Sequence, residues 1–170
     1  MKGMLQVYTG DGKGKTTAAI GLAIRAIGAG LNVFMGQFVK SMKYSEIKAL
    51  ENIENITVKQ YGLDCFIKNE PNEEDIKAAR KGLEDIKGVL KSGEYDLVIL
   101  DEANIAVYFG LFSVEELIEA IKDRNDEVEV IVTGRKAKDK IIELADLVTE
   151  MKETKHYYHK GIEARDGIER

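Results

Sequence analysis

The feature that most limits what this chain can fold into is its segment 7–19, VYTGDGKGKTTAA. It joins a short apolar run at residues 4–8 to a segment, residues 16–29, whose apolar residues recur with helical spacing. The string approaches the phosphate-loop pattern Gly-x-x-x-x-Gly-Lys-Ser/Thr, but Thr9 stands at the first glycine position and the glycine follows at Gly10. Backbone N–H groups of such a turn converge on an anion at a helix N-terminus. The alternative interpretation is a tight strand-to-helix turn that binds no ligand. The string Gly-x-Gly-Lys-Thr-Thr after a first strand is unusually specific, and it favours phosphate binding.

Short apolar segments alternate with longer amphipathic ones along the rest of the chain. Strands are predicted at residues 32–39, 56–62, 95–102, 127–135 and 146–152, and helices at 45–52, 72–93, 113–124 and 138–145. Ser113 followed by Glu116 is typical of a helix capping box. The alternation indicates parallel βαβ units with helices on both faces of the sheet. We therefore predict an α/β fold: a mostly parallel open sheet in a single P-loop NTP-binding domain of the RecA-like type. It spans residues 1–170, with residues 156–170 forming an irregular tail over the site.

Composition narrows the class of partner. The 170-residue chain has a formal net charge of −5, which argues against a dedicated nucleic-acid binder. Cys65 is the single cysteine of the sequence, which excludes an internal disulfide and fits a reducing compartment. The sequence shows neither the apolar run of a signal peptide nor an apolar segment long enough to span a membrane. We expect a cytoplasmic protein that binds neither nucleic acid nor membrane.

The second half of the site is expected where the later strands end. The strand VILDE provides Asp101 and Glu102, and the next strand ends at Arg135. Ligands of open α/β sheets lie outside the carboxyl ends of the strands. Lys15 would contact terminal phosphates, Thr16 would ligate Mg²⁺, and a strand-end carboxylate would hold the same metal. Arg135 would neutralise phosphate charge or cap a helix. These residues predict ATP binding with Mg²⁺, but a hydrolase, a kinase and an adenosyl-transferring enzyme would all need them.

A family resemblance narrows the reaction. The strings TGDGKGKTTAAIGLAIRAIGAG, GQFVKS, VILDE, VTGR and LADLVTEM occur in this order. The chain closes with the pattern Gly-x-x-Ala-x-x-Gly-Ile-Glu, formed by Gly161, Ala164, Gly167, Ile168 and Glu169. Together they resemble the ATP:corrinoid adenosyltransferases of the single-domain P-loop type. The resemblance implies that Co(I) of a corrinoid attacks the 5′-carbon of ATP and that triphosphate leaves, in adenosylcobalamin biosynthesis or salvage.

The same resemblance implies the phosphate-binding and metal-binding residues. The triphosphate loop would consist of Gly10, Asp11, Gly12, Lys13, Gly14, Lys15 and Thr16. The residues that stabilise the leaving triphosphate, and hence act in catalysis, would be Lys13, Lys15 and Arg135. Thr16 and Glu102 would be the Mg²⁺ ligands, with Asp101 behind them.

Further contacts to the nucleotide and the corrinoid are carried over by position. They are Arg25, Gln37, Phe38, Leu63 and Phe66. Arg25 would contact the nucleotide or be an ordinary surface charge of its helix, and Phe38 would contact a ligand or belong to the core. Leu63 and Phe66 would displace the lower axial ligand of cobalt or merely pack within their loop. Their stretch, YGLDCFIKN, departs from the Gly-Phe-x-Trp spacing common in the family.

The resemblance also implies partners: a small-molecule corrinoid, an electron-donating flavin reductase and a second copy of the chain in a homodimer. Longer family members carry an N-terminal arm that covers the corrinoid, and this sequence is expected to lack it. Two other classes stay open on the residues alone. One is a P-loop kinase or NTPase in which Glu102 polarises an attacking water, and the other is an ATP-sensing regulatory module.

Overall fold

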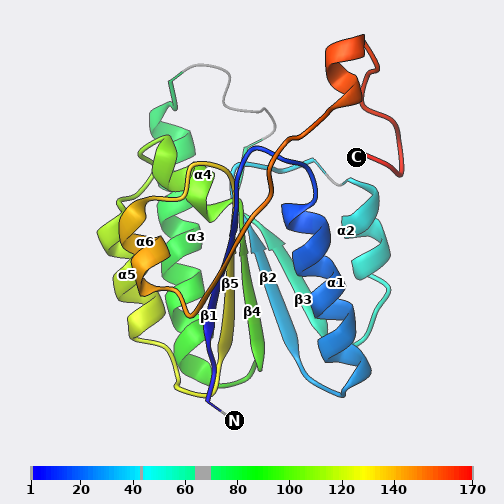
Figure 1. The fold of residues 1–170 in the computed structure, drawn as a ribbon. Helices are drawn as coiled ribbons and strands as arrows, with labels where there is room; N and C mark the ends of the chain where they lie inside the picture. The colour runs from blue at the N-terminus through cyan, green and yellow to red at the C-terminus, as the bar shows by residue number, and fades with distance from the viewer. Residues whose placement is uncertain (1, 43, 64–69, 170) are drawn as a thin grey trace.

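The central feature of the fold is a parallel sheet with helices on both faces (Figure 1). The computed structural model describes residues 2–42, 44–63 and 70–169. Within these residues six strands pair in the order β3-β2-β4-β5-β1-β6, and every strand pair is parallel. The strands are β1 (Leu5–Thr9), β2 (Val33–Gln37), β3 (Ile56–Gln60), β4 (Leu97–Asp101), β5 (Glu129–Thr133) and β6 (Leu147–Glu150). The predicted α/β class and parallel open sheet are confirmed.

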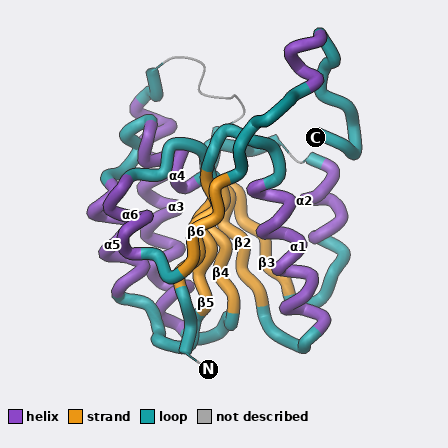
Figure 2. The backbone as a smooth tube through the Cα atoms, in the orientation of Figure 1, coloured by secondary structure: helices purple, strands orange, loops and turns teal. Residues whose placement is uncertain are grey.

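Helices cover the two faces of the sheet unequally (Figure 2). One face carries α1 (Lys15–Gly28) and α2 (Ser45–Leu50). The other carries α3 (Glu73–Ser92), α4 (Ala103–Tyr108), α5 (Val114–Lys122) and α6 (Asp139–Leu144). Each face encloses its own apolar layer, and the strands β1, β2, β4 and β5 contribute buried side chains to both layers. None of the helices in the described residues is long and apolar enough to cross a membrane.

Local sequence signals explain where several helices begin. The predicted capping box at Ser113 and Glu116 is present: the Ser113 hydroxyl accepts from the Glu116 amide, and the Glu116 carboxylate accepts from the Ser113 amide. Asn72 and Asp75 form a second capping box at the start of α3. The short helix α4 was not predicted, because its six residues follow directly on a strand and are too few to show a helical period.

The sheet order places one strand between the strand that leads into the glycine-rich loop and the strand that ends in Asp101. That intervening strand is β5, which pairs with both β1 and β4. The carboxyl ends of β1, β5 and β4 therefore lie along one edge. After β6 the chain runs across this edge to a short 3₁₀ helix, η1 (Tyr157–Lys160).

Candidate functional site: a phosphate loop beneath a C-terminal tail

The glycine-rich loop between β1 and α1 lies against the chain that follows β6. Gly10 and Gly14 have φ angles of 95° and 115°, in the left-handed region that favours glycine. A Cβ atom on Gly10 or Gly12 would lie 2.5 Å or 2.7 Å from the carbonyl oxygen of Met151. That same oxygen accepts a hydrogen bond of 2.6 Å from the Gly12 amide. Glycines are thus required at these positions because another backbone packs against the loop.

Lys15 is held inside this loop. Its Nζ donates to the carbonyl oxygens of Gly10 and Gly12, at 2.8 Å and 2.6 Å. The residue is only 8% exposed. Burial lowers the pKa of the Lys15 ammonium from its ordinary value, and the nearby charge of Arg135 lowers it further. The ammonium therefore sits at the centre of the loop, where the sequence motif places a phosphate-binding cation.

Asp101 is the buried polar centre beneath the loop. Its Oδ1 accepts from the hydroxyls of Thr16 (2.8 Å) and Thr133 (2.6 Å), and its Oδ2 accepts from Nε2 of Gln37 (2.8 Å). The side chain has no exposed surface. One carboxylate thus joins the start of α1 to the ends of β2, β4 and β5. Three hydrogen bonds fix its orientation, and through it the orientation of the Thr16 hydroxyl.

Glu102, the next residue, faces the pocket. Its φ is 57°, and its amide donates to the Thr133 hydroxyl at 3.0 Å. Its Oε1 lies 3.5 Å from Nζ of Lys40. Burial raises the pKa of the Glu102 carboxyl above its ordinary value, and the Lys40 charge opposes that rise. The left-handed backbone turns two successive acids in different directions, Asp101 into the sheet edge and Glu102 toward the pocket.

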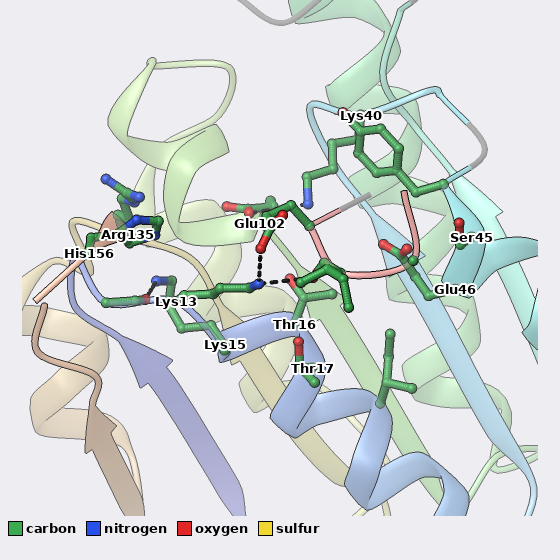
Figure 3. A pocket seen from close by; sticks show the side chains of 17 residues that line it. Lys13, Lys15, Thr16, Thr17, Lys40, Ser45, Glu46, Glu102, Arg135 and His156 are labelled. Carbon is green, nitrogen blue, oxygen red and sulfur yellow. Dashed lines mark hydrogen bonds and ion pairs between the residues drawn. The ribbon is translucent and has the colours of Figure 1, made fainter. Parts of the chain in front are cut away.

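These groups surround a pocket of about 550 Å³ (Figure 3). Its lining residues are Gly12, Lys13, Gly14, Lys15, Thr16, Thr17, Ile20, Lys40, Tyr44, Ser45, Glu46, Glu102, Arg135, His156, Gly167, Ile168 and Glu169. The structure thus brings together the predicted loop residues, Glu102 and Arg135. Sequence reasoning missed Lys40, Tyr44 and Glu46 as pocket residues, whereas His156 belongs to the segment 156–170 that it expected as a tail. The string GQFVKS, already part of the resemblance, was the signal that could have identified Lys40.

Several predicted contacts lie elsewhere. Arg25 is ten residues along α1 from Lys15, about 15 Å at the rise of an α-helix, and it lines a separate pocket with Lys2 and Glu127. Gln37 is fully buried and bonded to Asp101, and its Oε1 accepts from Gln60. Neither residue lines the pocket around the glycine-rich loop: Arg25 lies at the far end of α1, and Gln37 has no exposed surface. A contact of either residue with the nucleotide stays a prediction.

Two more expectations concern apolar residues. Phe38 has no exposed surface and packs in the core, with its ring 5.2 Å from that of Phe112 and 5.7 Å from that of Tyr61. The structure therefore places Phe38 in the core, which is one of the two alternatives that the sequence left open. Leu63 follows β3 and is 38% exposed. Phe66 lies outside the described residues.

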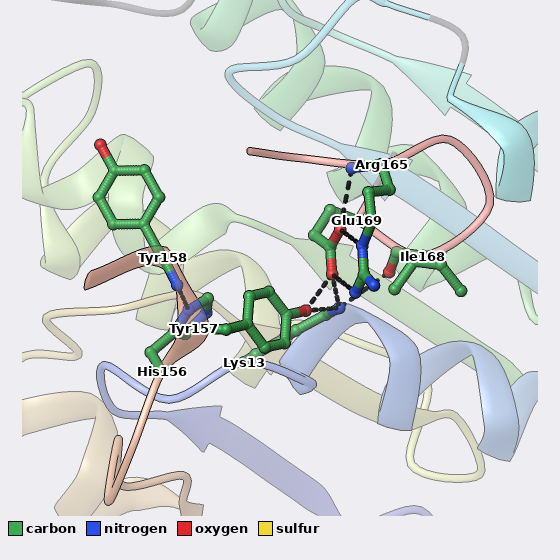
Figure 4. A network of polar contacts seen from close by, with 7 residues as sticks. All are labelled: Lys13, His156, Tyr157, Tyr158, Arg165, Ile168 and Glu169. Carbon is green, nitrogen blue, oxygen red and sulfur yellow. Dashed lines mark hydrogen bonds and ion pairs between the residues drawn. The ribbon is translucent and has the colours of Figure 1, made fainter. Parts of the chain in front are cut away.

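The C-terminal tail closes one side of the pocket through a polar cluster (Figure 4). Nζ of Lys13 donates to the Tyr157 hydroxyl (3.2 Å), the Ile168 carbonyl (2.9 Å) and Oε1 of Glu169 (2.7 Å). The Glu169 carboxylate also accepts from the Tyr157 hydroxyl and from the amide and guanidinium of Arg165. These donors hold the pKa of Glu169 well below its usual range, with Arg165 the largest contributor and Lys13 next. The tail is thus bonded to the glycine-rich loop through Lys13.

The oxygen groups beside the loop fit Mg²⁺. Among the described residues no cluster of three or more His, Cys, Asp or Glu side chains could hold a metal by itself. The Thr16 hydroxyl, oriented by Asp101, and the Glu102 carboxylate are instead hard oxygen donors at one edge of the pocket. Mg²⁺ is commonly held by one or two such groups together with substrate phosphates and water. This donor set suits a metal that is bound jointly with a nucleotide.

Strand β1, a glycine-rich loop closed by Lys15 and Thr16, and a buried acid at the end of β4, which is separated from β1 by β5, define a P-loop nucleotide-binding protein. Residues 1–170 match the model of the family described as ATP:corrinoid adenosyltransferase BtuR/CobO/CobP. The chain belongs to this family, and its activity is the transfer of the adenosyl group of ATP to a corrinoid.

Individual relatives agree with the family match. A corrinoid adenosyltransferase of Escherichia coli K12 is 34% identical over 168 residues, which cover 99% of this chain and 86% of the relative. A corrinoid adenosyltransferase from a Sinorhizobium species is 36% identical over 172 residues, which cover 99% of this chain and 80% of the relative. The corrinoid adenosyltransferase CobA of Salmonella typhimurium is 34% identical over 168 residues, which cover 99% of this chain and 86% of the relative. The matches support the transferase over the kinase, NTPase and sensor alternatives.

Proposed function

We propose that the pocket holds the whole triphosphate of ATP as the leaving group of the adenosyl transfer. The electron pair of Co(I) forms the bond to the 5′-carbon, the C5′–O bond breaks, and its electrons leave with the triphosphate. The observation that carries the proposal is the convergence of Lys13, Lys15 and Arg135 on one pocket around the glycine-rich loop. Fixed cations at the position where negative charge develops lower the barrier to such a departure. The product serves adenosylcobalamin biosynthesis or salvage.

The residues of the loop contribute to stabilising the triphosphate in different ways. Lys15, enclosed by the carbonyls of Gly10 and Gly12, supplies a buried positive charge, and the backbone amides from Lys13 to Thr16 would supply further donors. Lys13 lines the same pocket, but its amine also holds the tail. We therefore assign Lys15 the larger part in stabilising the triphosphate. Arg135 adds charge from the end of β5.

Mg²⁺ completes the proposed site. Thr16 and Glu102 would hold it, and Asp101 would keep the Thr16 hydroxyl in place from beneath. When bound, Mg²⁺ neutralises phosphate charge. Asp101 itself is enclosed by three hydrogen-bond donors and faces the sheet edge, so its role is to orient its neighbours.

The corrinoid side of the proposal rests on the family resemblance. Leu63, exposed at the carboxyl end of β3, is our candidate for contact with the corrinoid face. A flavin reductase would supply the electron that produces Co(I), and two copies of the chain would form a homodimer. We propose a cytoplasmic location for this chemistry, since reduction to Co(I) needs a reducing compartment.

The decisive experiment is anaerobic incubation of the protein with ATP and chemically reduced cob(I)alamin. We expect the absorbance change of adenosylation together with one equivalent of inorganic triphosphate, measured by ion chromatography. Incubation with ATP alone is the control and should yield no ADP. Release of ADP and phosphate in place of triphosphate would contradict the proposal and favour a kinase or NTPase.

Replacing Glu102 by Gln tests the metal assignment. We expect the Mg²⁺ concentration that gives half-maximal adenosylation to rise roughly tenfold or more, while the product stays triphosphate. Glu143, an exposed residue of α6, offers the matched Glu→Gln control, which should leave Mg²⁺ dependence unchanged. An unaltered Mg²⁺ requirement in the Glu102→Gln protein would remove Glu102 from the metal site.

A further inference from the structure

The residue Lys40 follows an unusual backbone position. Strand β2 ends at Gln37, and Val39 has a φ of 63°. A β-branched residue in the left-handed region is a steric outlier, because its Cβ crowds the adjacent carbonyl. Such strain persists where the surrounding structure imposes it, and it gathers at sites that bind or react. At this position the strained backbone turns the chain out of the core and directs Lys40 to the pocket.

A second strand end fixes Lys40 independently. A Cβ atom on Gly62 would lie 2.5 Å from the Lys40 amide nitrogen and 2.7 Å from its carbonyl carbon and oxygen. The chain after β3 therefore packs directly on the Lys40 backbone, which only glycine permits. Strain on one side and close packing on the other hold this residue in a single place.

The side chain of Lys40 reaches the part of the pocket occupied by Glu102. It is 17% exposed, and its Nζ lies 3.5 Å from Oε1 of Glu102 and 6.0 Å from the centre of the Tyr44 ring. Figure 3 shows Lys40 and Arg135 on opposite sides of Glu102. A largely buried ammonium attracts an incoming anion more strongly than an exposed one, because the surrounding dielectric is low. Lys40 thus faces the two loop lysines and Arg135 across one pocket.

We propose that Lys40 is a further triphosphate-binding residue, which holds the phosphate chain from the β2 side as it leaves. This inference rests on the proposed function. In the absence of substrate, Glu102 balances the Lys40 charge. With the triphosphate in place, its oxygens take up the same ammonium, and the leaving group is held between Lys40 and Arg135.

The test variant is Lys40→Met, which removes the charge and keeps the apolar part of the side chain. Lys40→Arg keeps the charge, and Lys48→Met makes the same substitution at an exposed position of α2 as a control. Adenosylation of pre-reduced cob(I)alamin gives kcat and the KM for ATP, and inorganic tripolyphosphate serves as a product inhibitor. Thermal unfolding establishes that each variant is folded. Should Lys40→Met fail to fold because Glu102 loses its partner, Lys40→Gln takes its place.

For Lys40→Met we expect the KM for ATP and the inhibition constant of tripolyphosphate to rise together, on the order of tenfold, as for the loss of one charged contact. Lys40→Arg should recover most of the loss, and Lys48→Met should match the unsubstituted protein. Unchanged values for both constants, or a fall in kcat alone, would overturn the inference. The unsubstituted protein in the same assay separates the two proposals: if it releases no triphosphate, the proposed function fails, whatever Lys40 does.

Discussion

The floor and the cover of the pocket are built by different means. The floor is the glycine-rich loop with Asp101 and Lys15, and these two side chains are almost fully buried. Lys15 donates to carbonyls of the loop, and Asp101 accepts from Thr16 at the start of α1 and from the ends of β2 and β5. The cover is the tail from His156 to Glu169, which joins the loop through Lys13. There the Lys13 and Glu169 side chains are 40% and 14% exposed.

The difference concerns how firmly each part is held. Buried, mutually satisfied hydrogen bonds cannot be exchanged for water without a penalty, so the floor keeps its shape as the pocket fills and empties. Ion pairs near solvent contribute little stability each, because water and salt compete for the same charges. We therefore expect the floor to govern the chemical step and the cover to govern access to the pocket.

The largest effect is expected from Lys15→Ala. It removes the enclosed charge of the floor, and the loss of one such contact costs roughly 3 kcal/mol of transition-state stabilisation, on the order of 10²-fold in kcat. Circular dichroism and thermal unfolding should show an intact fold. Lys13→Ala, in the same loop, should reduce kcat much less. Equal losses of kcat in the two variants would contradict the proposed division, in which Lys15 acts in the chemical step and Lys13 mainly retains the tail.

A smaller effect is expected from Glu169→Gln in the cover. The variant removes the negative charge that Lys13 and Arg165 share, so the tail should leave the loop more often. Tryptic cleavage after Lys155, Lys160 and Arg165 should accelerate roughly twofold to fivefold, as suits an ionic contact that is partly exposed on the Lys13 side, with kcat almost unchanged. Glu163→Gln, at an exposed tail position, is the control. Cleavage at the original rate would show that the polar cluster does not retain the tail.

The smallest effect concerns pH. Burial lowers the pKa of Lys15, so this ammonium loses its proton at a lower pH than an exposed lysine with a pKa of about 10.4. ATP binding should be strongest below the pKa of Lys15 and should weaken as the pH rises through it. Titration calorimetry of ATP binding from neutral to alkaline pH gives the profile. Lys15→Arg, which stays charged throughout, should flatten it; a profile shared by both proteins would assign the titration to another group.

The sheet and the floor of the site were largely predictable from the sequence. Uniformly apolar segments such as that ending in Asp101 mark buried parallel strands, and the loop string identifies its own position between strand and helix. Because the carboxyl ends of parallel strands share one edge, the sequence also predicted that Glu102 and Arg135 would meet the loop. These inferences use local patterns together with one topological rule.

The remaining features depend on contacts that leave no local pattern. Phe38 follows a strand at the correct edge, but its backbone turns it into the core against Phe112. Arg25 lies ten residues along α1 from Lys15 and lines a separate pocket. The partner of Lys13 lies more than 150 residues away in an irregular segment, and no periodicity connects the two. The direction of a side chain, its position along a helix and its pairing with a residue far away in the sequence were therefore known only from the structure.

Met151 gives the loop and the tail a common anchor. Its amide donates to the Thr9 carbonyl at 2.8 Å and its carbonyl accepts from the Gly12 amide at 2.6 Å, directly before the chain departs into the tail. The backbone of this one residue is therefore bonded to the triphosphate-binding loop and is covalently continuous with the tail. We expect a displacement of the tail that breaks the bond between Gly12 and Met151 to remove a contact that shapes the loop, so that opening of the cover and release of the triphosphate would be coupled.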